Sequence, residues 1–173
     1  MLADPISAQD LNIYGDATLP WDRARAAMAA GLGLPETPAF LGTAGAAGHP
    51  SSAGIGCVES AGWLYFTSGP GTRKSRNLAA NPFCTLSFRF PDVDLVFSGA
   101  AQRAVDPDEL DRVTGVYRAG GWPAERSGDA VTAPYSAQSA GPAPWQLFRF
   151  TPHAAVGVAL TEPHGATRWH FAH

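Results

Sequence analysis

The residues whose types and spacing best suit ligand binding lie in the stretch 65–74, which reads Tyr-Phe-Thr-Ser-Gly-Pro-Gly-Thr-Arg-Lys. It predicts a strand, a tight turn and a helix in that order, and we call it the junction. A helix N-terminus presents N–H groups without intrahelical partners and a partial positive charge, so it binds phosphate readily. Hydroxyl and basic side chains would add further donors. The candidate phosphate ligands are Thr67, Ser68, Thr72, Arg73 and Lys74.

A capped helix that carries two solvated bases is the alternative interpretation of the junction, and these residues alone support both equally. The spacing matches neither G-x-G-x-x-G nor G-x-x-x-x-G-K-[ST], so it indicates neither a dinucleotide-binding turn nor a P-loop. The chain has 12 basic residues, and Lys74 is the only lysine among them. Because arginine occupies all other basic positions, the single lysine indicates that the junction is worth considering as a binding site.

The composition is that of one globular domain. The chain has 173 residues, of which 45% are hydrophobic, and this length is sufficient to bury a core. The formal net charge is −3 and no stretch collects basic residues, which argues against nonspecific nucleic-acid binding. No apolar run reaches the roughly 20 residues that span a bilayer, and the first residues lack the pattern of a signal peptide. We therefore expect a cytoplasmic protein without nucleic-acid or membrane partners.

Turn residues and hydrophobic periodicity predict a mainly β fold, with an irregular segment at 1–18 and one domain over 19–173. The predicted helices are 20–31, 72–80 and 107–118, and the predicted strands are 39–43, 52–58, 63–67, 83–90, 95–105, 145–150, 154–160 and 167–171. Residues 119–144 are predicted as a long loop, a kind of segment that often forms a lid or an interface. The pattern indicates a six- to eight-stranded antiparallel split β-barrel with a few peripheral helices.

Several motifs follow one another in a specific order. The first is Trp63–Thr67 followed by Arg-Lys-x-Arg-Asn-Leu-x-x-Asn-Pro-Phe at 73–83. The second is Asp-Leu-Val-Phe-Ser-Gly-x-Ala at 94–101. The last are Pro-Trp-x-Leu-Phe-Arg-Phe-x-Pro at 144–152 and Thr-Arg-Trp-x-Phe at 167–171. In this order and spacing, the motifs resemble the flavin-binding split barrels of the pyridoxamine 5′-phosphate oxidase-like family.

The resemblance implies an FMN site at an interface between two copies of the chain, and therefore a homodimer. In that family, hydroxyls at the end of a strand and an Arg-Lys pair at the start of the next helix hold the flavin phosphate. By position these are Thr67, Ser68, Arg73 and Lys74, with Thr72 as the helix cap. The preceding strand meets the flavin ring largely through its backbone, here at Ser52, Ala53, Gly54 and Ile55. Near the C-terminus, Arg168 and Trp169 are candidates for flavin or substrate contact.

One departure from the family affects the expected substrate. The oxidase proper holds its substrate with an Arg-Leu-His-Asp-Arg stretch, where this chain has Gly-Ala-Thr-Arg-Trp at 165–169. We therefore expect an FMN-dependent oxidoreductase that transfers hydride between the flavin and another small organic substrate. The alternatives are a deazaflavin-dependent reductase of the same fold and a flavin-binding protein without turnover. No catalytic side chain and no metal-ligand spacing is identified, and Cys57 and Cys84 are interpreted as buried thiols.

Overall fold

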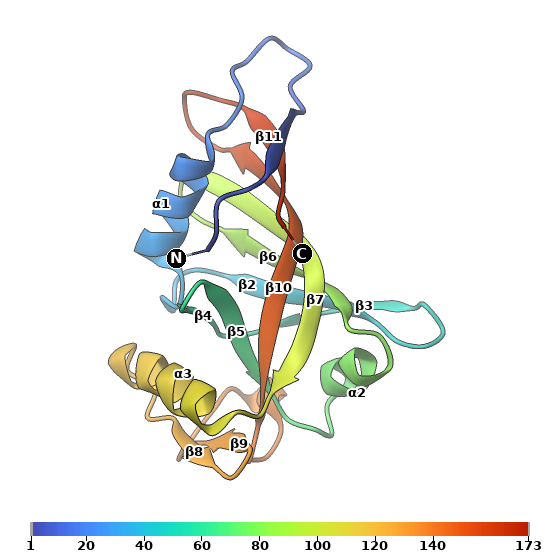
Figure 1. Cartoon of the computed structure of the whole chain (residues 1–173), viewed down its shortest axis with the longest axis vertical. Coiled ribbons are helices and arrows are strands. Elements are labelled where there is room, and N and C mark those ends of the chain that lie inside the picture. Colours follow the sequence, from blue (N-terminus) through green and yellow to red (C-terminus); the bar gives the residue numbers. More distant parts are fainter. Residues whose placement is uncertain (1, 173) are drawn as a thin grey trace.

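A computed structural model of the chain describes residues 2–172 and shows a long, strongly curved antiparallel sheet with helices at its ends (Figure 1). The helices are α1 (Trp21–Gly31), α2 (Arg73–Ala80) and α3 (Pro107–Ala119), with a short 3-10 turn at Gln138–Ala140. The strands are β1 (Ser7–Asp10), β2 (Ala39–Ala44), β3 (Pro50–Gly54), β4 (Cys57–Ser60), β5 (Trp63–Ser68), β6 (Phe83–Arg89), β7 (Val93–Ala104), β8 (Glu125–Ser127), β9 (Ala130–Thr132), β10 (Gln146–Ala159) and β11 (Ala166–His170). No helix formed by residues 2–172 is long and apolar enough to cross a membrane.

The 14-residue strand β10 organises the sheet. Along one edge it pairs with β7 over its whole length, and along the other it pairs first with β5 and then with β11. From β7 the sheet continues through β6 and β2 to β3, and from β5 it continues to β4. The two outermost strands, β3 and β4, are joined by residues 55–56 alone, so the sheet must curl until its ends meet. No ladder joins β3 to β4 in the described part of the chain, which leaves the barrel split there.

The inside of the curled sheet is filled by a core rich in aromatic side chains. Phe97, Phe150 and Trp169 are almost completely buried. Helix α1 covers this core, because the Trp21 ring packs edge-on against Phe97 and Trp169, with ring centroids 6.4 and 5.2 Å away. Aromatic pairs in this geometry add to the energy of apolar burial.

A second, smaller core lies on the other face of β5, beneath α3. Its members are Tyr65, Ala104, Leu110, Val113, Tyr117, Ala124, Val131 and Leu147. The Tyr65 hydroxyl donates to Glu109 of α3 at 2.7 Å, and Arg149 of β10 forms an ion pair with the same carboxylate at 3.2 Å. These contacts fix α3 against β5, immediately beside the junction.

The predicted helices and the mainly antiparallel β fold are confirmed, and four details differ. Residues 7–10 are not irregular but form β1, which pairs with β11, and the sheet has nine strands rather than six to eight. The strand predicted at 52–58 is divided into β3 and β4 by Ile55 and Gly56. The two strands predicted at 145–150 and 154–160 form one strand, because an irregularity at Pro152 absorbs the change of register. The predicted loop 119–144 contains the hairpin β8–β9.

Candidate functional site

The junction has the expected order of strand, turn and helix, and its hydroxyl groups bond to one another. Thr72 is the N-cap of α2: its Oγ1 accepts from the Ser75 N–H at 3.3 Å and lies 2.9 Å from the Gly69 carbonyl oxygen. The Ser75 hydroxyl donates to the Ser68 Oγ at 2.7 Å, and that oxygen lies 2.9 Å from Thr72 Oγ1. The network caps the N–H of Ser75 at the start of α2 and fixes the direction of the helix relative to β5.

Thr67 and Ser68 do not point toward one ligand, although both were predicted to bind phosphate. Successive side chains of a strand lie on opposite faces. Ser68 is fully buried and belongs to the cap network, whereas Thr67 lies on the face of Tyr65 and α3 and lines a cavity. Within this chain, Ser68 and Thr72 therefore shape the junction, and Thr67 is the hydroxyl directed toward open space.

Lys74 is the most unusual residue of the junction. Its side chain is only 6% exposed, and its ammonium donates to the Ser139 carbonyl oxygen at 3.0 Å. No ion pair to Lys74 is found among residues 2–172, and burial lowers its pKa from the ordinary lysine value. Arg73, which precedes it, is exposed and likewise has no acidic partner in the described chain. The junction thus carries two positive charges that no carboxylate of the described residues balances.

A segment that sequence analysis left as loop covers the junction. This cover segment (residues 137–141) contains the 3-10 turn, and its Ala140 carbonyl accepts from the Gly69 N–H at 3.0 Å. A Cβ at residue 69 would collide with that carbonyl oxygen, so the close approach requires glycine. The sequence signal for this contact was weak, because residues 119–144 lack periodicity and nothing in them indicates which surface they cover.

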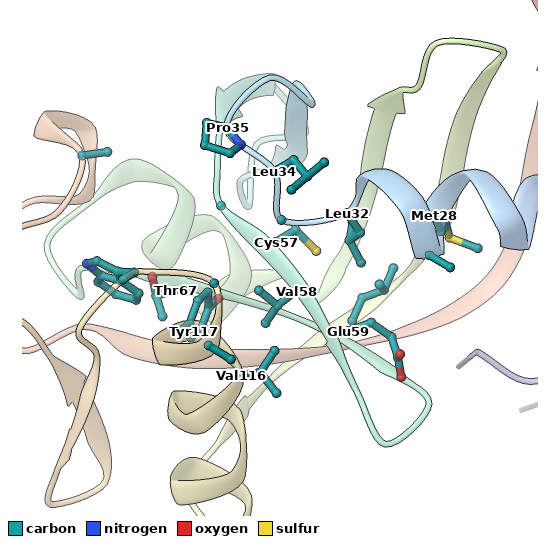
Figure 2. A pocket seen from close by; sticks show the side chains of 18 of the residues that line it. Met28, Leu32, Leu34, Pro35, Cys57, Val58, Glu59, Thr67, Val116 and Tyr117 are labelled. Atoms are coloured by element: carbon teal, nitrogen blue, oxygen red, sulfur yellow. The ribbon is translucent and has the colours of Figure 1, made fainter.

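A cavity of about 740 Å3 opens beside Thr67, between α1 and α3, and we call it the α1–α3 cavity (Figure 2). Its volume falls within the roughly 300–1,000 Å3 typical of ligand and cofactor sites. Strand β4 runs along it with one edge free, since its only ladder partner among residues 2–172 is β5. The lining also includes Gly56, Cys57, Tyr117 and the loop residues 135–137.

None of the four predicted ring-binding residues lines this cavity, although the segment leads into it, and Ser52 lines a separate groove on the outer face of the sheet. Ser52, Ala53 and Gly54 belong to β3, and Ile55 connects β3 to Gly56 at the cavity wall. A Cβ added at Gly54 or Gly56 would meet no atom within 4 Å, so there is open space beside the backbone at both positions.

Arg168 and Trp169, in contrast, do not lie at the junction of the same chain. Thr67 pairs with Leu147 of β10 and Arg168 pairs with Val156, so about 30 Å of strand separates them. Trp169 is a core residue with 1% exposure and is not accessible to a cofactor. Arg168 is exposed on the outer face of the sheet, in the same cross-strand row as Val156, Val96 and Phe40.

The two thiols are poor candidates for chemistry. Burial raises the pKa values of Cys57 and Cys84 to about 12, so both remain protonated at neutral pH. Both are free cysteines, as predicted. Within residues 2–172, no group of three or more His, Cys, Asp or Glu side chains is arranged to hold a metal ion.

The contact between Gly69 and Ala140 predicts the effect of one added methyl group. Gly69→Ala should lower the free energy of unfolding by about 1–3 kcal/mol, because the methyl forces the cover segment away from the junction. Hydrogen exchange of residues 137–141 should become faster. Gly71→Ala is the matched control, since a Cβ there meets nothing within 4 Å, and its stability should change by less than about 0.5 kcal/mol. Unchanged exchange in Gly69→Ala would contradict this account.

The lowered pKa of Lys74 predicts a pH-dependent cost to stability. Below its folded pKa the buried ammonium destabilises the folded state, and this cost disappears as pH rises toward the ordinary lysine value. Ligand-free Lys74→Met should therefore melt at the wild-type temperature or higher at pH 7, with the difference shrinking at alkaline pH. Arg73→Met, at the exposed neighbour, should show no such trend. A large loss of stability in Lys74→Met would instead identify the ammonium as a structural tether.

Comparisons with known proteins find solved structures of similar fold. The chain is similar in fold to PhzG from Burkholderia lata 383 in complex with tetrahydrophenazine-1-carboxylic acid, with a TM-score of 0.59 and 15% identity over 88% of this chain and 85% of that one. It is also similar to a pyridoxamine 5′-phosphate oxidase-related, FMN binding protein from Nostoc punctiforme PCC 73102 (TM-score 0.58, 18% identity, 89% and 92% of the two chains). An F420 reductase aligns with a TM-score of 0.50 and 21% identity over 72% of this chain and 91% of that one.

Identities this low show a shared fold alone. No match is found among curated proteins. The sequence of residues 13–159, however, matches the family model described as pyridoxamine 5′-phosphate oxidase, and this match spans most of the chain. The chain belongs to the pyridoxamine 5′-phosphate oxidase family.

Proposed function

We propose that the protein binds FMN, with the flavin phosphate at the junction, and transfers hydride between the flavin and a small organic substrate. The observation that carries this proposal is the buried ammonium of Lys74, whose hydrogen-bond partner is a neutral carbonyl. Burial of a charge without a counter-charge is costly. A phosphate bound beside Lys74 would supply the missing negative charge and raise the lysine pKa again.

Three further features of the junction fit a phosphate. The N–H groups of Arg73 and Lys74 stand in the first turn of α2 and have no intrahelical partner. The Arg73 guanidinium is exposed and not engaged by any carboxylate of residues 2–172, so it is available to grip two phosphate oxygens. Thr67 adds a hydroxyl from the cavity side.

The ring of the flavin would lie along the end of β3. There the residues proposed to meet it, Ser52 to Ile55, lead into Gly56 and the α1–α3 cavity. The open space beside Gly54 and Gly56 allows a flat ring to approach the backbone, whose peptide groups would hydrogen-bond to it.

The flavin, when bound, supplies the hydride chemistry itself. What remains for the chain is to hold the cofactor, orient it and keep water away. Arg73, Lys74 and Thr67 bind and orient, and the cover segment closes the site over Lys74. Cys57, which lines the cavity, stays protonated at neutral pH and therefore offers no nucleophile.

A deazaflavin is the second candidate cofactor, and the fold similarity to an F420 reductase favours testing it. Such a coenzyme carries a phosphodiester and an anionic tail, which need a longer basic groove. The basic residues at the junction are Arg73, Lys74 and Arg76, whereas Arg25, at the cavity wall, is bonded to Asp4 and Asp22. This short extent of positive charge favours FMN.

A flavin-binding protein without turnover is the third candidate.

We also propose that the protein is a homodimer that pairs through the outer face of the sheet. Cross-strand partners share a face, so Phe40, Ser87, Val96 and Val156 form one row there, which continues to Arg168. Phe40 and Val96 are 48% and 41% exposed, and a shallow groove of about 660 Å3 crosses the same face beside Ser52. A second copy on this face would bring Arg168 of one chain toward β3 of the other.

Titration with FMN tests the proposed cofactor site. Purified protein should retain a flavin absorption band through desalting after FMN is added, and retain less of the deazaflavin coenzyme. Lys74→Met and Arg73→Ala should each lower FMN affinity about ten- to a hundredfold, the value of one charge-assisted contact. Arg103→Ala removes an exposed arginine that is paired with Asp129 and is the matched control. Wild-type FMN affinity in both junction variants would refute the phosphate assignment. Tighter binding of the deazaflavin than of FMN would make the deazaflavin the proposed cofactor instead.

Light scattering tests the proposed dimer. The wild-type protein should have the mass of two chains at micromolar concentration. Val96→Arg, in the middle of the outer face, should shift the mass toward one chain because it buries an unpaired charge. Val105→Arg is the control, since Val105 is 51% exposed and lies outside this row. A monomeric wild-type protein would contradict the proposal.

A further inference from the structure

The α1–α3 cavity extends from Thr67 at the junction to helix α1, and its two ends are lined by different kinds of side chain. Figure 2 shows Thr67 toward one side of the cavity and Met28 and Leu32 toward the other, with Val58 and Val116 between them. The end beside Thr67 adjoins the junction. The end beside α1 is lined mainly by aliphatic side chains and includes none of the residues proposed to hold the flavin.

The charged side chains at the cavity wall are already hydrogen-bonded. Among the described residues that line it, only Arg25 and Glu59 carry a formal charge. The Arg25 guanidinium donates to Asp4 at 2.7 Å and also to Asp22, while the Glu59 carboxylate accepts from the Gly62 N–H at 2.7 Å. An anionic ligand would therefore enter a largely apolar space without a cation left to neutralise it, which is costly.

Aromatic residues form a fixed part of the wall on the Thr67 side, where Figure 2 shows Tyr117. The Trp122 Nε1 donates to the Tyr135 carbonyl at 2.7 Å, and the Trp122 ring packs edge-on against Tyr117 at a centroid distance of 5.0 Å. The Tyr135 hydroxyl donates back to the Gly121 carbonyl at 3.4 Å. Rings held in this way offer preformed contact area to another ring. Among residues 2–172 only β5 forms a ladder with β4, so the other edge of β4 can present peptide groups to polar atoms of a ligand.

From these observations we infer that the α1 end of the cavity is the substrate site and that it takes an uncharged, largely apolar compound with few hydrogen-bonding groups. The inference rests on the proposed function in placing the cofactor at the other end, beside Thr67. It excludes phosphorylated or carboxylated substrates from this end of the cavity, because Arg25 is bonded to Asp4 and Asp22.

A matched pair of fluorescent probes tests the charge preference. N-phenyl-1-naphthylamine is uncharged, and 8-anilinonaphthalene-1-sulfonate has the same rings with one negative charge. The uncharged probe should bind the wild-type protein with a Kd at least about tenfold lower than that of the sulfonate, as expected when an uncompensated charge must be buried. Equal affinity for the two probes, or tighter binding of the sulfonate, would overturn the inference.

Tryptophan substitutions on α1 test the location. Ala29 lines the cavity, while Ala26, on the same helix, is exposed and outside the lining. Ala29→Trp should weaken binding of the uncharged probe about tenfold by filling the space, and Ala26→Trp should leave it unchanged. Val116→Trp narrows the cavity from α3 and should have the same effect, which provides a second variant if Ala29→Trp folds poorly. Wild-type probe affinity in folded Ala29→Trp and Val116→Trp would overturn the inference.

The same samples are titrated with FMN so that the two proposals can fail separately. If FMN binds and the uncharged probe does not, the proposed function stands and the substrate inference is overturned. If the probe binds with the expected variant pattern and FMN does not, the cavity assignment is supported and the proposed cofactor is overturned.

Discussion

The 14-residue strand β10 bears ladders on both edges, and the positions of the other elements follow from it. Its first half pairs with β5, and the register of Leu147 opposite Thr67 fixes where along β10 the junction begins. Its second half aligns β11, which in turn holds β1. Along the opposite edge β7 follows it throughout, at a separation so small that a Cβ at Gly99 would collide with the Thr151 carbonyl. One continuous strand therefore fixes the register of all of these ladders, with a single irregularity between Pro152 and Ala154.

Local signals in the sequence predicted the elements, and contacts between distant segments decided the rest. Thr72 and Asp106 are polar caps followed by amphipathic stretches, and both begin helices as expected. Alternation along a strand already separates Thr67 from Ser68, but packing decides which of them faces the helix cap and which the cavity, and Ser68 as a phosphate ligand stays a prediction. Trp169 is buried partly by Trp21, which lies almost 150 positions earlier in the sequence, so the local sequence pattern could not predict its burial. The cover segment and the cavity were missed for the same reason, since each is assembled from segments far apart in the chain.

The junction combines a rigid frame with an unbalanced charge. The hydroxyls of Ser68, Thr72 and Ser75 satisfy one another, so they hold α2 in place without a ligand. Lys74, in the same first turn of α2, donates its ammonium to a backbone carbonyl and has no carboxylate partner among residues 2–172. A site whose frame is complete but whose charge is not suits reversible anion binding, because little reorganisation is needed when the ligand arrives.

The two-residue connection between β3 and β4 also has a consequence for how the family can diversify. Since Ile55 and Gly56 alone join the ends of the curled sheet, they leave β4 with an open edge that is flanked by α1 and α3 rather than by another strand. Neither helix takes part in the ladders that hold the barrel. The faces of these helices that pack on the two cores are constrained, but positions that face the cavity, such as Ala29 and Val116, can change without altering any ladder. The split in the barrel therefore separates the residues that shape the cavity from the strands that hold the junction.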